Sequence, residues 1–166
     1  MKKLFMMVAL SLVMVACDKE EDEFSRKNIE NTYWQIIGKD YIEYYNKDGE
    51  LMDSEYESVV GVGGRYILFE NNGKYTMTAY GYIGYHLRYY SEGKYSFDNN
   101  NIYIENGPTI FKTSDNEMMY LYRTRDKSRE GEDVLCKQYH ILKRCDSIPE
   151  SFENLGDYEY REHLSW

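Results

Sequence analysis

Cys17 is the first residue of the chain whose surroundings indicate a specific chemistry. It directly follows a run of 13 uncharged residues, 4–16, which itself follows two lysines. That run is too short to cross the hydrocarbon core of a bilayer, because a spanning helix needs about 20 residues. A basic start, a short apolar core and a small residue, Ala16, at its end are typical of a secretory signal peptide. We therefore expect residues 1–16 to be removed, which leaves Cys17 at the new amino terminus.

The tetrapeptide that ends at this cysteine, Met-Val-Ala-Cys, resembles the lipobox of bacterial lipoproteins. In that class the cysteine thiol is acylated and the chain is cut just before it, so the resemblance implies lipidation of Cys17. Several acyl chains together hold a protein on a membrane, whereas a single chain gives only marginal binding. The alternative is an ordinary cleaved signal in which the cysteine is incidental.

Six charged residues, 18–23, follow the cysteine without a break. Such residues do not enter a bilayer, so we predict that residues 17–30 form a solvated acidic tether. An acidic cluster in this place also resembles the surface-export signal of lipoproteins in certain gut-dwelling Gram-negative anaerobes. That resemblance implies a protein anchored in the outer membrane and exposed on the cell surface. The alternative is a plain polar linker on a protein that faces the periplasm.

The other chemically capable residues form no recognisable reactive motif. The histidines, His86, His140 and His163, lack metal-ligand spacing, and the sequence contains no nucleophile-elbow, phosphate-loop or zinc-protease motif. His140 is expected in the middle of a strand, as a hydrogen-bonded wall residue. Cys136 and Cys145 fall in one predicted strand, where nine residues separate them by roughly 30 Å, too far for a disulfide. We expect free thiols, no enzyme activity, no metal site and no cofactor.

Length and charge limit the remaining classes of function. Removal of residues 1–16 from the 166-residue chain leaves 150 residues, the size of one domain. The net charge of the whole chain is −9, and loss of the two signal-peptide lysines makes the mature chain −11. That charge argues against a nucleic acid partner, because the phosphates would be repelled.

The elements that must position any site are predicted from runs rich in tyrosine. The chain has 19 tyrosines, which favour a half-buried pleated surface, and only two prolines, which would interrupt a strand ladder. Turn signals separate short apolar or aromatic runs at residues 32–38, 41–46, 65–70, 75–90, 93–98, 101–105, 109–113, 117–125 and 133–144. Strands at this regular spacing predict an all-β fold, either an antiparallel sandwich or an up-and-down β-barrel. The tail, residues 146–166, is a predicted C-terminal extension with a short helix near Pro149.

Alternation along these runs predicts which side chains face inward. Within residues 65–78 the odd-numbered Ile67, Phe69, Tyr75 and Met77 are apolar, and the same parity continues through the later strands. If the strands form a small barrel, such inward side chains either fill the lumen or line a cavity for one small ligand. The candidate lining consists of Tyr75, Met77, Tyr95, Phe97, Phe111, Met119 and Tyr139.

Four short patterns together resemble the bacterial lipocalin-like lipoproteins. They are Trp34 on the first strand, Phe69-x-x-x-Gly73-x-Tyr75, Gly93-x-Tyr95 and Asn101-x-x-Ile104. The resemblance implies an antiparallel up-and-down barrel of about 8–9 strands over residues 31–145, in keeping with the strand spacing. It also implies that Trp34 is structural and plugs the closed end of the barrel.

Residues 79–90 are the clearest candidate for a recognition surface. Five of them share one parity: Tyr80, Tyr82, His86, Arg88 and Tyr90. Outward aromatic rings with polar tips can stack on sugar faces or anchor a protein partner. The alternative is that these tyrosines simply build the barrel wall.

Two functions stay open at this point. The first is a membrane-anchored, surface-exposed lipoprotein whose lipocalin-like barrel binds a small apolar or aromatic molecule without catalysis. The second is a protein with a filled barrel that recognises a protein or glycan through its tyrosine-rich outer surface. Lumen volume separates the two, because about 300 Å³ or more is needed for a ligand site.

Overall fold

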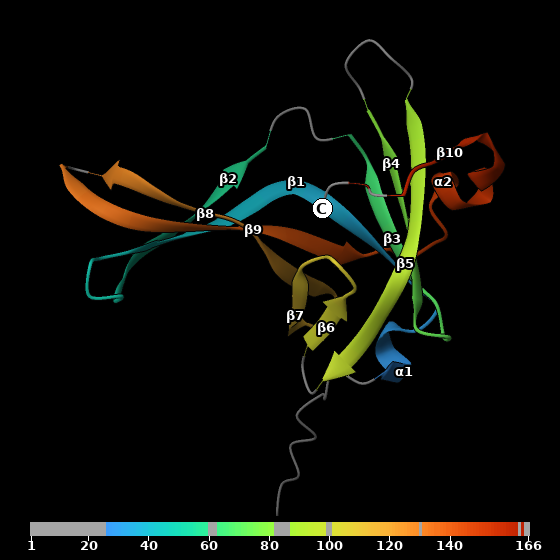
Figure 1. Ribbon diagram of the computed structural model, residues 1–166, viewed down its shortest axis with the longest axis horizontal. Helices are drawn as coiled ribbons and strands as arrows, with labels where there is room; N and C mark the ends of the chain where they lie inside the picture. The colour runs from blue at the N-terminus through green and yellow to red at the C-terminus, as the bar shows by residue number, and fades with distance from the viewer. Residues whose placement is uncertain are drawn as a thin grey trace, which may run out of the picture.

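The computed structural model in Figure 1 describes residues 26–59, 63–81, 87–98, 101–129, 131–162 and 164. The expected signal peptide, Cys17 and most of the acidic tether lie outside the described residues, as do Tyr82 and His86. None of the described residues belongs to a helix that is both long and apolar enough to span a membrane.

The described chain consists almost entirely of β-strands, with three short helical segments. The helical segments are α1 (Arg26–Ile29), α2 (Glu150–Glu153) and the 3₁₀ turn η1 (Leu155–Asp157). The strands are β1 (Thr32–Tyr45), β2 (Leu51–Ser58), β3 (Arg65–Phe69), β4 (Lys74–Tyr80), β5 (Arg88–Asp98), β6 (Asn101–Ile104), β7 (Thr109–Ser114), β8 (Glu117–Arg129), β9 (Glu132–Arg144) and β10 (Glu159–Tyr160).

Eight of these strands close into an antiparallel barrel. Their order around the barrel is β1-β3-β4-β5-β6-β7-β8-β9, and β9 pairs with β1 to complete the circle. The remaining two lie outside this circle: β2 pairs with β1, and β10 adds to β5 as a parallel strand. The all-β, up-and-down barrel predicted from the sequence is therefore confirmed.

Two glycines explain part of the sequence pattern in the β3–β5 wall. Gly73 has φ of 76° in the turn between β3 and β4, a conformation that residues with a side chain rarely adopt. Gly93 on β5 lies opposite Tyr75, and a Cβ atom there would approach Tyr75 Cε1 to 2.6 Å. The absence of a side chain at Gly93 thus leaves room for the tyrosine ring inside the barrel.

One hydrophobic cluster fills the barrel. Its fully buried side chains include Trp34, Ile67, Phe69, Met77, Ile102, Ile110, Met118, Tyr120 and Leu142. The Trp34 indole N–H donates a hydrogen bond of 2.8 Å to Thr32 Oγ1, and the Thr32 hydroxyl donates to the Ile29 carbonyl oxygen. Ile29 of α1 is itself part of the core at 2% exposure. The packed domain therefore begins before residue 31, inside the segment expected to be tether.

The expected inward orientation of Phe111, Met119 and Tyr139 is wrong. In β3, β4 and β5 the odd residues do face the core, but Asp98 pairs with Asn101 across the next hairpin. An odd residue of β5 consequently pairs with an even residue of β6, as in the pair Phe97–Ile102. From β6 onward the core is built from even residues, which are Ile102, Ile104, Ile110, Met118, Tyr120 and Leu142.

Three strands run on past the barrel wall and form a second structural unit. Residues 39–45 of β1, 51–58 of β2, 121–129 of β8 and 132–140 of β9 make a four-stranded antiparallel sheet, here called the arm. Figure 1 shows the arm projecting to the left of the barrel. The sequence had indicated two separate strands where β1 is continuous, no strand at residues 51–58, and a loop where the β8–β9 hairpin lies.

The arm curls so that its two edges approach each other. In the order β2-β1-β9-β8, a flat sheet would hold β2 and β8 about 14 Å apart. Arg129 Nη2 of β8 nevertheless lies 2.7 Å from Asp53 Oδ2 of β2. The inner face formed in this way encloses a small cluster of Ile42, Tyr44, Val134 and Cys136. The arm therefore has its own modest core, continuous with the interior face of the barrel strands.

The C-terminal extension packs on the outside of the barrel. Ser151 of α2 forms a buried hydrogen bond of 2.8 Å with Thr78 of β4, and Phe152 contacts the Tyr33 ring at 5.0 Å. Figure 1 shows α2 beside β4 and β5, outside the barrel. The helix predicted near Pro149 is thus present, and its role is to cover part of the barrel wall.

Candidate functional site

The barrel interior expected to hold a ligand is filled by side chains. Tyr75, Met77 and Tyr95 from the candidate lining are at most 7% exposed, and Phe97 packs against the same cluster. The Tyr95 ring contacts those of Phe69 at 5.1 Å and Phe97 at 5.3 Å. These inward residues contact one another and build the core.

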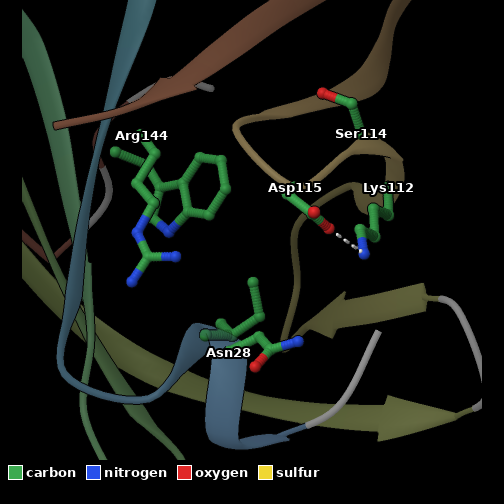
Figure 2. A pocket seen from close by; sticks show the side chains of 7 residues that line it. Asn28, Lys112, Ser114, Asp115 and Arg144 are labelled. Atoms are coloured by element: carbon green, nitrogen blue, oxygen red, sulfur yellow. Dashed lines mark ion pairs between the residues drawn. The ribbon is translucent and has the colours of Figure 1, made fainter. Parts of the chain in front are cut away.

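A pocket of about 290 Å³ lies at one end of the barrel, here called the end pocket. Its lining residues are Asn28, Ile29, Trp34, Lys112, Ser114, Asp115 and Arg144. Figure 2 shows Arg144 on one side, Lys112 and Asp115 on the opposite side, and Asn28 of α1 along a third. Its polar lining comes from three places in the sequence that only the closed barrel brings together.

The end pocket has three charged lining residues, and two of them form an ion pair with each other. Lys112 Nζ lies 2.6 Å from Asp115 Oδ1, so these two residues neutralise each other within one turn of β7–β8. Arg144 ends β9 directly opposite Trp34 of β1. No described residue places a carboxylate within ion-pair distance of its guanidinium. The charged side chains of the described lining therefore sum to one net positive charge, and Arg144 is the cation outside the Lys112–Asp115 pair.

A row of aromatic side chains crosses the outer face of the arm, opposite its small core, and ends on the barrel at Phe111 of β7. Tyr41 and Tyr56 have ring centroids 5.2 Å apart, Tyr41 and Tyr139 are 6.1 Å apart, and Phe111 lies 5.9 Å from Tyr139. These four residues, called the aromatic row, come from β2, β1, β9 and β7. Two of them, Phe111 and Tyr139, are residues that the sequence had assigned to the barrel lining.

Polar groups hold the rings of this face in place. Glu43 Oε2 accepts hydrogen bonds from Tyr45 at 2.7 Å and from Tyr139 at 2.8 Å. The hydrogen bond to Glu43, together with burial, raises the pKa of Tyr45 to about 12. Burial and the same carboxylate raise the pKa of Tyr139. Both hydroxyls therefore stay protonated donors at neutral pH, which keeps the rings oriented.

Exposed hydrophobic side chains gather on the arm. Among the described residues ten large hydrophobic side chains are exposed, and six of them belong to the arm: Leu51, Met52, Tyr56, Leu121, Tyr122 and Leu135. Strand pairing puts Leu51 and Leu135 beside Tyr45, and Leu121 beside Tyr139, on the face that carries the aromatic row. Clusters of exposed apolar side chains commonly mark interaction sites.

The recognition surface predicted at residues 79–90 is largely engaged within the molecule, as far as it is described. Tyr80 stacks on Tyr66 with centroids 6.5 Å apart. Arg88 lies 3.6 Å from the Asp157 carboxylate, and Tyr90 contacts the Tyr160 ring at 5.4 Å. The C-terminal extension thus contacts Arg88 and Tyr90, although the Arg88 side chain is still 46% exposed. Tyr82 and His86 lie outside the described residues.

A buried polar cluster joins the barrel to the arm. His140 Nδ1 and Asp40 Oδ1 are 2.6 Å apart, and Gln138 Nε2 donates a 2.5 Å hydrogen bond to the other oxygen of Asp40. The Tyr122 ring stacks over His140 at 4.1 Å. His140 is therefore the hydrogen-bonded wall residue expected from the sequence. Within the described ranges, no three His, Cys, Asp or Glu side chains are grouped to hold a metal ion.

Cys136 and Cys145 are free thiols, as the strand spacing predicted. Cys136 is fully buried in the arm core. Burial raises the pKa of the half-buried Cys145 thiol, which favours the protonated and weakly nucleophilic form. Neither thiol has the environment of a reactive cysteine.

Comparison of the chain with protein-family models, curated proteins and solved structures found no match. Two candidate sites result from the geometry: the outer face of the arm and the end pocket. Sequence reasoning missed the arm because β2 had no apolar alternation to reveal it. The one available signal was the density of tyrosines at residues 41–45 and at Tyr56.

Proposed function

We propose that this chain is a membrane-anchored, non-enzymatic interaction protein that binds a protein partner through the outer face of its arm. The observation that carries the proposal is the aromatic row with its adjacent exposed leucines, on a sheet that projects away from a filled barrel. The barrel is the rigid scaffold in this proposal. Tyrosine-rich apolar surfaces of this kind supply most of the binding energy in many protein interfaces.

The exposed leucines favour a protein over a glycan as the partner. Tyrosine rings suit either class, because they stack on sugars and on apolar side chains alike. Leu51, Leu121 and Leu135 are between 36% and 54% exposed. Aliphatic side chains form few favourable contacts with a hydrated sugar. Burial of such side chains against a protein gains roughly 25 cal/mol per Å².

The signal-peptide pattern and the Cys17 lipobox support anchoring of this module to a membrane. The acidic residues that follow support display on the outer surface, because they resemble the surface-export signal of lipoproteins in certain gut-dwelling Gram-negative anaerobes. Cys17→Ala should release the protein from membranes, and unchanged membrane retention would refute the anchor. Neutralisation of residues 18–23 should move the domain from the surface to the periplasm, as measured by protease accessibility on intact cells.

Site-specific photo-crosslinking in the native host tests the arm as the binding surface. A photoreactive amino acid in place of Tyr56 should crosslink one defined protein, identified by mass spectrometry. The matched control replaces Tyr103 of β6, which is 39% exposed on the barrel. Leu135→Ser in the Tyr56 probe should abolish the adduct. Equal adducts from both positions, or an adduct that survives Leu135→Ser, would overturn the proposal. If the protein instead binds a glycan and Tyr56→Ala abolishes that binding, the partner is a sugar and not a protein.

The end pocket supports a second function, the binding of a small molecule. Its volume of about 290 Å³ is close to the lower limit for ligand sites. Small-molecule binding is the function expected for a lipocalin-like barrel, but here the pocket lies at the barrel end and not in the lumen. The lining also differs from the apolar one predicted, because it is rich in polar and charged groups.

A further inference from the structure

We infer that the end pocket binds the anionic group of a small organic molecule, a carboxylate or a phosphate monoester, through Arg144. This inference rests on the second function proposed above and specifies its ligand. Because Lys112 and Asp115 neutralise each other at 2.6 Å, Arg144 leaves the described lining with one net positive charge.

The chemistry of the guanidinium group suits an anion. Its planar fork of N–H donors matches the two oxygens of a carboxylate or phosphate, and such charge-assisted bonds are the strong ones. Arg144 lies in a chain whose net charge is −9, so the positive charge of the pocket is a local feature. A general surface field would not draw an anion to this protein, and recognition must come from the pocket itself.

The rest of the lining suits an organic body attached to that anion. Trp34 and Ile29 form only a small apolar floor on the core side of the pocket, because they are almost fully buried at 1% and 2% exposure. Asn28 and Ser114 add hydrogen-bonding groups, Asn28 from α1 and Ser114 from the side that carries Lys112 and Asp115. An aromatic ring bearing one acidic group would therefore place its apolar part on the floor and its charge at Arg144.

The variants Arg144→Gln and Lys143→Gln provide a matched pair for the test. Both remove one positive charge from adjacent residues at the end of β9, and both side chains are exposed. Strand alternation points Arg144 into the pocket and Lys143 to the opposite face of the sheet. Neither substitution removes a core side chain, and equal denaturant midpoints will verify that both variants are folded.

The binding measurement is a titration of the purified protein followed by NMR, with phenyl phosphate, benzoate and the neutral benzyl alcohol as probes. Phenyl phosphate or benzoate should bind with shifts at Trp34, and benzyl alcohol should bind at least about tenfold more weakly, because a charged hydrogen bond contributes about 1.5–3 kcal/mol. Arg144→Gln should lower the affinity for the two anions about tenfold or more and leave the affinity for benzyl alcohol unchanged. Lys143→Gln should change neither.

Each outcome has a distinct meaning. Preference for one anion over the other identifies whether phosphate or carboxylate is the ligand group. Equal binding of benzyl alcohol and the anions, or anion binding that survives Arg144→Gln, would overturn the anionic ligand while leaving a small-molecule pocket. Absence of shifts at Trp34 with all three probes would overturn the inference and the small-molecule function together.

Discussion

The barrel and the arm share three strands, β1, β8 and β9, and yet the two regions place their apolar side chains differently. In the barrel the inward side chains join one large cluster that includes Trp34, Phe69 and Tyr120. In the arm the inward cluster has only four members, and the outer face carries exposed leucines and tyrosines. The barrel buries its apolar side chains, which stabilises the fold, whereas the arm exposes several of them to solvent.

Polar contacts compensate for the thin core of the arm. Tyr44 donates a 2.5 Å hydrogen bond to Glu55, and the Arg129 guanidinium lies 4.1 Å above the Tyr44 ring while pairing with Asp53. The Arg129 contacts connect β8 with β1 and β2, two strands with which β8 is not paired, whereas the Tyr44–Glu55 bond reinforces the existing β1–β2 pairing. We therefore expect the barrel core to contribute most of the free energy of unfolding, whereas the shape of the arm depends on a few polar contacts near its surface.

The largest expected effect comes from a cavity in the barrel core. Phe69→Ala removes a ring at 0% exposure, and a core change of this kind costs about 3–5 kcal/mol in the free energy of unfolding. Chemical denaturation should show a large drop in midpoint with the whole chain unfolding together. A loss below about 1 kcal/mol would mean that the filled barrel is not the main source of stability.

A cavity in the arm should have a smaller and more local effect. Ile42→Ala removes a side chain at 1% exposure, and we expect the low end of the usual range, about 2 kcal/mol, because the small cluster can collapse. Hydrogen exchange should rise in residues 39–45 and 132–140, while β3, β4 and β5 stay protected. Equal loss of protection in both regions would show that arm and barrel unfold as one unit.

Alkaline pH should also act on the arm. Burial and the hydrogen bond to Glu55 raise the pKa of Tyr44 from 10.0 to about 12, and Tyr45 is raised to the same value. The folded arm thus favours the protonated hydroxyls, so their contribution to stability is complete below pH 10 and is lost as the pH rises towards 12. Near-ultraviolet circular dichroism and tyrosinate absorbance should change together in this window. Ionisation of all tyrosines near pH 10 without a structural change would contradict it.

The smallest expected effect is on the ion pair that links the arm edges. Arg129 and Asp53 are 34% and 54% exposed, so Arg129→Gln should lower the free energy of unfolding by less than about 1 kcal/mol. Hydrogen exchange at residues 51–58 should still increase, because the curl of the sheet is released. The control is Lys47→Gln, whose partner Asp133 is 3.6 Å away and 78% exposed, and it should change neither quantity.

The barrel was predictable because its strands follow simple local rules. Alternation of apolar residues and turn pairs such as Asn72-Gly73 indicated where most strands run. The inward face was predicted correctly as far as Phe97 and wrongly beyond it. In the hairpin that pairs Asp98 with Asn101, the inward positions change from odd residues in β5 to even residues in β6. The prediction assumed that inward residues stay odd-numbered along the whole chain, so it missed this change.

The arm was less predictable for physical reasons that particular residues show. The inward positions of β2 are Asp53, Glu55 and Glu57, so the strand has a polar inner face and no apolar period. Lys127 and Arg129 belong to a charged segment that looks like a loop, but they lie on the inner face of the curled sheet, where Arg129 pairs with Asp53 of this acidic strand. The end pocket was equally hidden, because Asn28, Lys112 and Arg144 become neighbours only when the barrel closes.

The hairpin tips of the arm, at residues 46–50 and around Gly131, lie beyond every hydrogen bond of the barrel. Two residues added to each strand of such a hairpin would keep all side chains on their faces, because side-chain direction repeats every two residues. Each such step extends the sheet by about 7 Å. The length of this sheet can therefore change in fixed increments while the barrel stays the same, whereas an insertion of one residue would turn the outer face of the arm inward.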